Sequence, residues 1–218
     1  MRPILNAPRV RLRTITPADA PALFGLFSDA ETVRYWSHTA FTERAEADAL
    51  VADIAAHAEA GDLLQWGVEV RATGVLVGTA TLAGIDRMNQ RAEVGFLVGR
   101  AHWGHGYGGE AMRALISHAF GGPDVGGIGL RRLEADVDPR NAASLRVLER
   151  LGFRREGLLR ERWRVGGGVQ DTVLLGLLAS EWPAAYPAGA LRPCGAAGRR
   201  RRRRWRGRAG GRRSRPLR

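Results

Sequence analysis

The sequence lacks several features that would point to particular classes of protein. Its 218 residues include one cysteine and no lysine. A single cysteine excludes an internal disulfide framework and a cysteine-rich metal site. No run of about 18 apolar residues occurs, so no transmembrane helix is expected. Residues 1–10 lack the apolar core of a secretory signal peptide, and we therefore expect a cytoplasmic protein.

Positive charge is concentrated at one end of the chain. The 34 basic residues outnumber the 22 acidic residues, which gives a net charge of +12. Thirteen arginines and no acidic residue lie in residues 183–218, so residues 1–182 are close to neutral. Composition and length predict one folded domain over residues 1–182 and a disordered Arg-rich tail over residues 183–218.

Three hypotheses account for this tail. Arg199–Arg204, followed by Trp205, would suit contact with RNA or the ribosome through phosphates and base stacking. The tail is equally well explained as a dispensable extension. It also has the composition of GC-rich codons read out of frame, and the intact mass of the natively expressed protein would expose such an artefact.

Hydrophobic periodicity predicts alternating strands and helices before the tail. Residues 9–15 (RVRLRTI) alternate polar and apolar side chains, as a half-buried strand does. Thr16 as a cap, Pro17 in the first turn and Asp19 near the positive end predict a helix start. Further strands are expected at about 64–70, 75–82, 92–98, 133–137, 153–159 and 172–178, and helices at about 42–61, 110–120 and 142–151. The order predicts a mixed α/β fold with one sheet and helices on both faces.

A glycine-rich turn is the first candidate for chemistry. The strand Glu93–Val98 leads through Trp103–Gly109 directly into an apolar helix. Glycines allow successive backbone amides to converge, and together with a helix N-terminus they can bind a pyrophosphate. The turn has neither the Lys-Ser/Thr ending of a nucleotide-triphosphate loop nor the dinucleotide spacing. Taken alone, it is more often an ordinary tight turn.

A second motif, NAASLRVLERLGF over Asn141–Phe153, narrows the interpretation. The two motifs together resemble the GNAT acetyltransferases, which transfer acetyl from acetyl-CoA to amines. The family signature Q/R-x-x-G-x-G/A is matched by Trp103–Gly108, with tryptophan in the Q/R position. The pattern W-G-x-G-Y, then N-x-x-S-x-x-V-L-E-x-x-G-F, is similar to that of the N-terminal acetyltransferases of ribosomal proteins. The resemblance covers about residues 8–182 and implies a GNAT fold with a mostly antiparallel central sheet of six or seven strands and helices on both faces.

The resemblance also implies which residues bind acetyl-CoA. Backbone amides of the turn would hold the pyrophosphate, the outer strand edge would pair with the pantetheine arm, and the second motif would bind that arm. Asn141 has a plain alternative role as a helix N-cap, and the two roles can coexist. The implied cofactor-binding residues are Phe96, Leu97, Val98, Gly104, His105, Gly106, Tyr107, Gly108, Gly109, Asn141, Ser144 and Arg146.

Two residues are candidates for proton transfer. Glu93 occupies a position where GNAT enzymes often place a catalytic glutamate, and burial would raise its pKa by desolvation. A structural hydrogen-bond acceptor is its alternative role. Leu148 stands where many GNAT enzymes have a tyrosine acid, and the ribosomal-protein-like subgroup shares this departure. In that subgroup Ser144 is the proposed partner of the thiolate; alternatively, Ser144 satisfies a backbone amide in the first helical turn.

The acceptor side is less well defined. Tyr35, Trp36 and Trp163 are candidate substrate-binding residues, although aromatic residues more often belong to the core. Glu161 and Asp171 are weaker acidic candidates on that side. The five histidines show no metal-ligand spacing, and no metal is expected.

The sequence thus predicts an N-acetyltransferase, monomeric or homodimeric, that uses acetyl-CoA and a primary amine. The favoured acceptor is a protein N-terminal α-amine of the ribosomal-protein type. The alternatives are a small-molecule amine, such as an antibiotic or amino acid, and a non-catalytic RNA-binding module that uses the tail.

Overall fold

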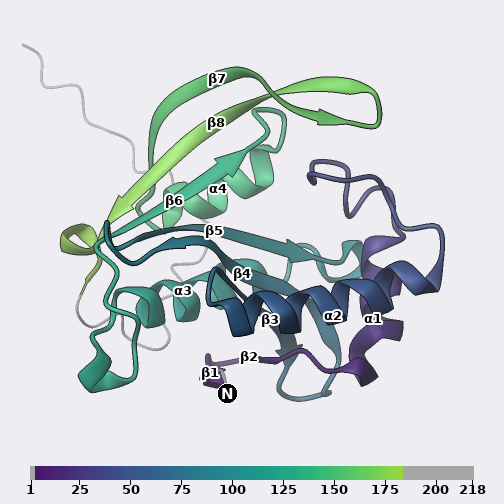
Figure 1. Ribbon diagram of the computed structural model, residues 1–218, viewed down its shortest axis with the longest axis horizontal. Helices are drawn as coiled ribbons and strands as arrows, with labels where there is room; N and C mark the ends of the chain where they lie inside the picture. The colour runs from purple at the N-terminus through teal and green to yellow at the C-terminus, as the bar shows by residue number, and fades with distance from the viewer. Residues whose placement is uncertain (1–2, 184–218) are drawn as a thin grey trace, which may run out of the picture. The chain divides into compact units, whose positions relative to one another are not determined.

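One eight-stranded sheet organises residues 3–183, the part of the chain that the computed structural model describes (Figure 1). The strands lie in the order β1-β2-β3-β4-β5-β6-β8-β7, and every neighbouring pair is antiparallel except β5 and β6. The strands are β1 (Leu5–Asn6), β2 (Val10–Thr14), β3 (Leu63–Val70), β4 (Leu76–Asp86), β5 (Arg91–Val98), β6 (Arg132–Val137), β7 (Arg154–Val165) and β8 (Gly168–Leu178). The prediction of a mixed, mostly antiparallel sheet is confirmed.

Helices cover both faces of the sheet, as expected. Alternation along β5 shows why: Val94 belongs to one hydrophobic cluster with α3 and α4, whereas Leu97 belongs to the other with α1 and α2. The helices are α1 (Ala20–Phe27), α2 (Arg44–Ala60), α3 (Tyr107–Phe120) and α4 (Ala142–Arg150). Short 3-10 turns lie at Pro17–Asp19, Arg100–His102, Pro123–Val125 and Ala179–Glu181. Within residues 3–183, none of the helices has the length and apolar character needed to cross a membrane.

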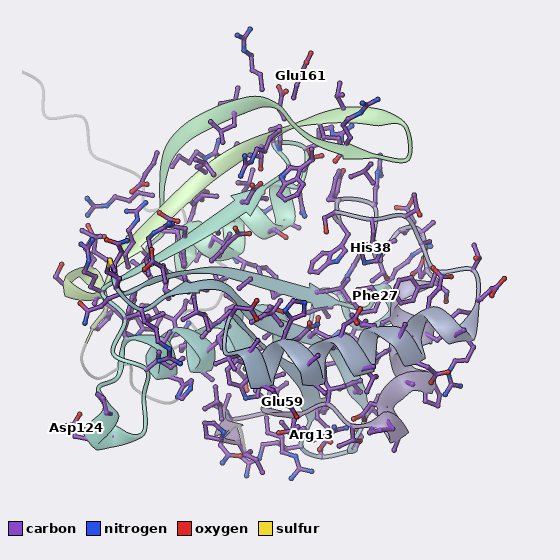
Figure 2. All side chains as sticks on the ribbon, in the orientation of Figure 1. Arg13, Phe27, His38, Glu59, Asp124 and Glu161 are labelled. Atoms are coloured by element: carbon purple, nitrogen blue, oxygen red, sulfur yellow. The ribbon has the colours of Figure 1, made fainter. Side chains whose placement is uncertain are left out.

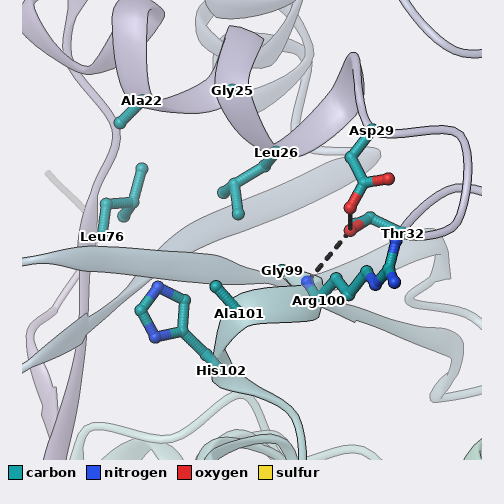
Figure 3. Close-up of a pocket in the computed structure, with 10 residues that line it drawn as sticks. All are labelled: Ala22, Gly25, Leu26, Asp29, Thr32, Leu76, Gly99, Arg100, Ala101 and His102. Atoms are coloured by element: carbon teal, nitrogen blue, oxygen red, sulfur yellow. Dashed lines mark hydrogen bonds between the residues drawn. The ribbon is translucent and has the colours of Figure 1, made fainter.

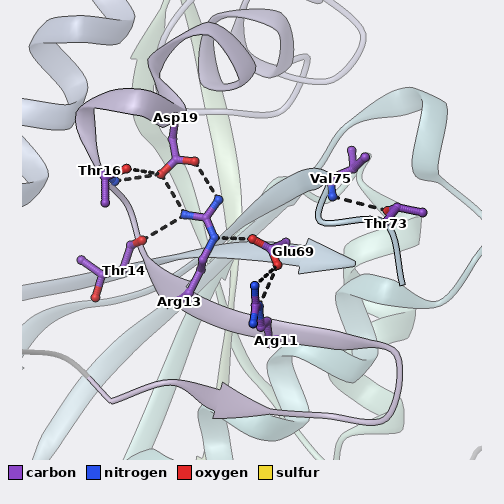
Figure 4. A network of polar contacts seen from close by, with 8 residues as sticks. All are labelled: Arg11, Arg13, Thr14, Thr16, Asp19, Glu69, Thr73 and Val75. Atoms are coloured by element: carbon purple, nitrogen blue, oxygen red, sulfur yellow. Dashed lines mark hydrogen bonds and ion pairs between the residues drawn. The ribbon is translucent and has the colours of Figure 1, made fainter. Parts of the chain in front are cut away.

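The start of the first helical segment is fixed by the expected cap together with a polar network. Thr16 is the N-cap of the 3-10 turn Pro17–Asp19 and forms a capping box with Asp19, whose carboxylate accepts from the N–H and the hydroxyl of Thr16. Arg13 donates to both oxygens of Asp19 at 2.7 and 2.8 Å and also to Glu69, which Arg11 shares (Figure 4). These arginines hold the pKa of the buried Asp19 and Glu69 carboxyls below their usual range. The predicted helix start is therefore confirmed, with Thr16 as the N-cap, Pro17 in the first turn and Asp19 completing the capping box.

Three element boundaries differ from those expected. The strand that the sequence analysis did not predict is β1, which has two residues and is too short to show an alternation of polar and apolar side chains. Helix α3 begins at Tyr107, inside the glycine-rich turn, instead of at Glu110. The hairpin of β7 and β8 runs to Gly167, because an edge strand exposed on both faces has no apolar alternation to reveal its length. The hypotheses about Arg199–Arg204 and Trp205 concern residues outside the described part of the chain.

Candidate active site

Strands β5 and β6 separate halfway along their length and leave a cleft between them. Their parallel pairing runs from Arg91 to Glu93 on β5, opposite Arg132 to Glu134 on β6, and no later pair is found in residues 3–183. Figure 1 shows the two ribbons diverging beyond this point. A cleft of about 930 Å³ lies here, between the end of β5, the glycine-rich turn, the start of α4 and the β7–β8 hairpin.

Some backbone N–H and C=O groups of β5 face this cleft, because they are not hydrogen-bonded to β4. Gly99 donates its N–H to the carbonyl of Val77 at 2.9 Å, and Val98 lies opposite Gly78. Because antiparallel pairs alternate between bonded and non-bonded, the N–H and C=O of Phe96 and Val98 point away from β4. The Val98 carbonyl accepts a hydrogen bond from the Trp103 indole at 2.6 Å, as this direction requires. An extended ligand can therefore pair with this edge as an added strand would.

The glycine-rich turn forms one end of the cleft. Gly104 and Gly106 both have φ near 80°, a conformation that favours glycine, and Gly106 immediately precedes α3. A Cβ on Gly108 would come within 3.1 Å of the Phe96 ring, so the helix packs tightly against β5. Unpaired amides at the N-terminus of α3 thus point into a space where an anion is favoured.

Most of the turn lines the cleft, and one residue does not. Gly104, Gly106, Tyr107, Gly108 and Gly109 line it. The His105 ring instead stacks on Tyr107 at 5.5 Å, which leaves the backbone amide as its candidate contact.

The second motif forms the opposite wall. Asn141 precedes α4, and its side-chain oxygen accepts from the Ser144 N–H at 3.1 Å, which confirms the expected N-cap. The cap uses the amide oxygen and leaves the amide NH₂ as a donor toward the cleft. Asn141, Ser144 and Arg146 all line the cleft, so the structure brings this motif together with the glycine-rich turn.

Glu93 lies on the wall of the cleft at the point where the two strands separate. Burial, followed by the negative charges of Asp136 and Glu134, raises the pKa of Glu93 above its ordinary value, and Arg162 opposes this in part. The direction of this shift agrees with the expectation, although the Glu93 side chain is exposed to the open cleft rather than buried in the strand. The carboxylate has no hydrogen bond or ion pair to other described residues, so the structural acceptor role has no partner here. A carboxylate with a raised pKa and no partner is suited to accept a proton.

Asp136 is a cleft residue that the sequence reasoning missed. It follows Glu134 by two residues on β6 and so faces the same side of the sheet as Glu93. The Trp163 indole donates to its two oxygens at 3.2 and 3.1 Å, and the Thr172 hydroxyl donates to one of them. Burial raises the pKa of Asp136. The alternation of RLEADV, with Leu133, Ala135 and Val137 buried, was the signal that could have placed Asp136 opposite the core.

The three candidate acceptor residues all line the same cleft. Tyr35 lies beside two arginines: the guanidinium carbons of Arg34 and Arg140 are 5.4 and 5.8 Å from the centre of its ring. Trp36 also packs edge-on against the core residue Phe27, with centroids 6.2 Å apart, so it has both of the roles considered. Trp163 reaches the cleft from β7 and orients Asp136.

The two weaker acidic candidates differ in position. Asp171 lines the cleft and accepts the backbone N–H of Glu161 at 2.8 Å. Glu161 does not line it, and its side chain lies at the outer edge of the β7–β8 hairpin (Figure 2). Its φ of 54° falls within an irregularity of the β7–β8 pairing, which turns this side chain outward.

A smaller cavity of about 270 Å³ lies between α1 and the 3-10 turn after β5 (Figure 3). Thr32 bridges its rim, donating to Asp29 at 2.9 Å and accepting the Arg100 N–H at 3.0 Å. None of the predicted site residues lines this cavity. The candidate chemistry is therefore confined to the larger cleft among the described residues.

Comparisons with known proteins agree with this geometry. Residues 9–154 match the family model described as the acetyltransferase (GNAT) domain. The chain is 34% identical over 178 residues to the N-acetyltransferase p20 of Bacillus licheniformis, and the match covers 82% of this chain and 97% of that protein.

Two solved structures share the fold. A GCN5-related N-acetyltransferase from Brucella melitensis has a TM-score of 0.73 and 29% identity, covering 84% of this chain and 82% of that chain. A Vibrio cholerae structure, provisionally named as a ribosomal-protein-serine acetyltransferase, has a TM-score of 0.67 and 25% identity, covering 80% and 97%. With the family match, these similarities show that the chain belongs to the GNAT acetyltransferases, a family that uses acetyl-CoA, and is an N-acetyltransferase.

Proposed function

We propose that this protein binds acetyl-CoA in the cleft between β5 and β6 and acetylates the α-amine at the N-terminus of a protein. The observation that carries the cofactor assignment is the open edge of β5, where backbone groups of Phe96 and Val98 face the cleft beside the glycine-rich turn. Acetyl-CoA, when bound, supplies the thioester whose acetyl group moves to the amine.

The residues present fit such a ligand. The amides of Gly104–Gly109 and the positive end of α3 suit a pyrophosphate. The β5 edge suits the amide-containing pantetheine arm, because it offers both donors and acceptors. Asn141 and Arg146 lie on the facing wall, where they can hold the arm from the other side.

Proton transfer is assigned to two side chains. Glu93 accepts the proton that the acceptor ammonium must lose before its nitrogen can attack, and a raised pKa makes it a stronger base than an ordinary glutamate. The Ser144 hydroxyl lies at the first turn of α4, on the cleft wall, and supplies a hydrogen bond to the departing sulfur. The aromatic side chains of Tyr35, Trp36 and Trp163 line the path of the acceptor.

The protein N-terminus is favoured as acceptor for two reasons. The motif pattern resembles that of the ribosomal-protein enzymes, and the similar Vibrio cholerae protein carries a ribosomal-protein name. A peptide N-terminus also presents its amine on a neutral backbone, which suits a cleft whose acceptor end carries carboxylates.

The test has two parts and uses the full chain. Acetyl-CoA at 100 times its Kd should stabilise the fold by about 2.7 kcal/mol, a shift of several degrees, whereas ATP and NADH should not. Release of CoA should then depend on added N-terminal peptides, including those of ribosomal proteins. A folded sample that acetyl-CoA does not stabilise would contradict the cofactor assignment. A sample that binds acetyl-CoA but acetylates only small amines would contradict the acceptor.

A further inference from the structure

Two carboxylates in the cleft, those of Glu93 and Asp136, form no ion pair with an arginine of residues 3–183, in a chain rich in arginine. Among residues 3–183, the neighbouring carboxylates on β6 and in the loop before α4 are paired with arginines. Glu134 is bridged by Arg91 and Arg132, and Asp138 is bridged by Arg140. Asp136 lies between Glu134 and Asp138 in sequence, yet only the neutral donors Trp163 and Thr172 bind it.

Three strands converge to fix the Asp136 carboxylate. It projects from β6, Trp163 reaches it from β7 and Thr172 from β8. These donors fix the orientation of the carboxylate without cancelling its charge. A carboxylate has about four acceptor positions, so lone pairs remain for a ligand in the cleft.

The cation that acts on both of these acids is Arg162. It lowers the pKa of both Glu93 and Asp136, but burial outweighs it in each case. Two carboxylates therefore share one wall of the cleft, and neither forms an ion pair within residues 3–183. Such a wall attracts a ligand ammonium and repels a ligand carboxylate.

We propose that Asp136 is the acceptor-binding residue that accepts a hydrogen bond from the substrate ammonium and excludes amines bearing an α-carboxylate, such as free amino acids. This inference rests on the proposed function and deepens it. Glu93 takes the proton, whereas Asp136 keeps its charge and holds the nitrogen in place. In a free amino acid the carboxylate is attached to the carbon that carries the amine, so it is brought against Asp136 and Glu93. A peptide N-terminus has a neutral amide at that position.

A matched pair of probes separates these two kinds of acceptor. L-Alaninamide and L-alanine share the side chain and the ammonium group and differ in amide against carboxylate. With the full chain and saturating acetyl-CoA, we expect kcat/KM to favour alaninamide by about tenfold or more, and the same order in Kd for the CoA-bound protein.

The variant Asp136→Asn keeps the oxygen that accepts from Trp163 and Thr172 but removes the charge. We expect it to raise the KM for alaninamide about tenfold, to bring the ratio of the two probes close to one, and to leave acetyl-CoA binding unchanged. Glu134→Gln is the matched control, because it changes the net charge equally on the same strand but removes a carboxylate that arginines already neutralise. It should keep the wild-type preference for alaninamide.

An unchanged probe ratio in Asp136→Asn would overturn the inference, as would a wild-type protein to which neither amine binds. A merely structural role for Asp136 would lower the melting temperature and kcat for both probes equally, which would also overturn it. Stabilisation by acetyl-CoA keeps the two proposals distinguishable. Its loss refutes the proposed function, whereas its presence with no discrimination between the probes refutes only the role of Asp136.

Discussion

At the scale of single residues, Glu93 is an acid whose environment raises its pKa above the ordinary value. It faces the cleft, it has no partner among residues 3–183, and its pKa is raised by burial and by Asp136. Glu93→Gln should lower kcat by about 10² to 10⁴ fold, since it removes a positioned base. Binding of acetyl-CoA should persist, as measured by thermal shift.

The same substitution should affect stability in a pH-dependent way. A carboxyl whose pKa is raised by folding stabilises the fold below its unfolded value, near 4.5, and loses that contribution as pH rises through the folded pKa. Glu93→Gln should therefore raise the melting temperature at pH 7 relative to wild type, with the difference vanishing near pH 4. Equal melting temperatures at both pH values would contradict the desolvated environment assigned to Glu93.

A second prediction concerns Arg13 and the stability of the fold. It pairs with Asp19 and Glu69, both buried, so Arg13→Met leaves Asp19 without its arginine and Glu69 with Arg11 alone, and should cost about 3 kcal/mol. Arg11→Met is the matched control. Its side chain is more exposed and Glu69 would keep Arg13, so it should cost about 1 kcal/mol or less.

Urea unfolding at several pH values tests this pair of variants. Because the pKa values of Asp19 and Glu69 are lowered by folding, their stabilising effect is present above their unfolded values and is lost as pH falls. The deficit of Arg13→Met should therefore shrink in acid. A deficit as small as that of Arg11→Met at pH 7 would show that the network contributes little.

At the scale of elements, the junction of the glycine-rich turn and α3 depends on a left-handed residue. Gly106→Ala forces a side chain into a φ of 80° and should cost about 1 kcal/mol of stability. Any relaxation turns the neighbouring amides away from the cleft, so acetyl-CoA binding should weaken about tenfold. Gly74→Ala places the same strain (φ 72°) in the turn between β3 and β4, and it should cost similar stability without affecting binding. Equal affinities in the two variants would contradict a binding role for the turn.

The sequence predicted those features of the elements that depend on neighbouring residues, and missed those that depend on contacts between distant strands. The turn and the N-cap at Asn141 depend on local chemistry, and both were predicted. Asp136 was missed because its role arises from Trp163 and Thr172, which join it only after two further strands have paired. Thr16 was predicted correctly as an N-cap because its partner Asp19 lies three residues away, whereas the contact of Asp19 with Arg13 depends on the folded structure.

At the scale of the whole molecule, the cleft is built by residues far from the C-terminal end. Every described residue that lines it lies between Glu31 and Asp171. A chain ending at Pro183 should therefore keep stabilisation by acetyl-CoA and amine-dependent release of CoA within about twofold of the full chain. Loss of both activities in a folded shortened chain would assign the C-terminal residues a part in the reaction. Loss of RNA binding alone would support the electrostatic hypothesis for the tail.

The separation of β5 and β6 has a further consequence, in the rate at which backbone hydrogens are replaced by solvent deuterium. The amides of Phe96 and Val98 point into the open cleft, whereas those of Leu97 and Gly99 point toward β4. Without a ligand, alternate amides along β5 should exchange fast and slow. Acetyl-CoA should slow the exchange of the fast amides selectively. Strand β5 would then show the protection of a strand that is paired on both edges, with the ligand taking the place of the second neighbour.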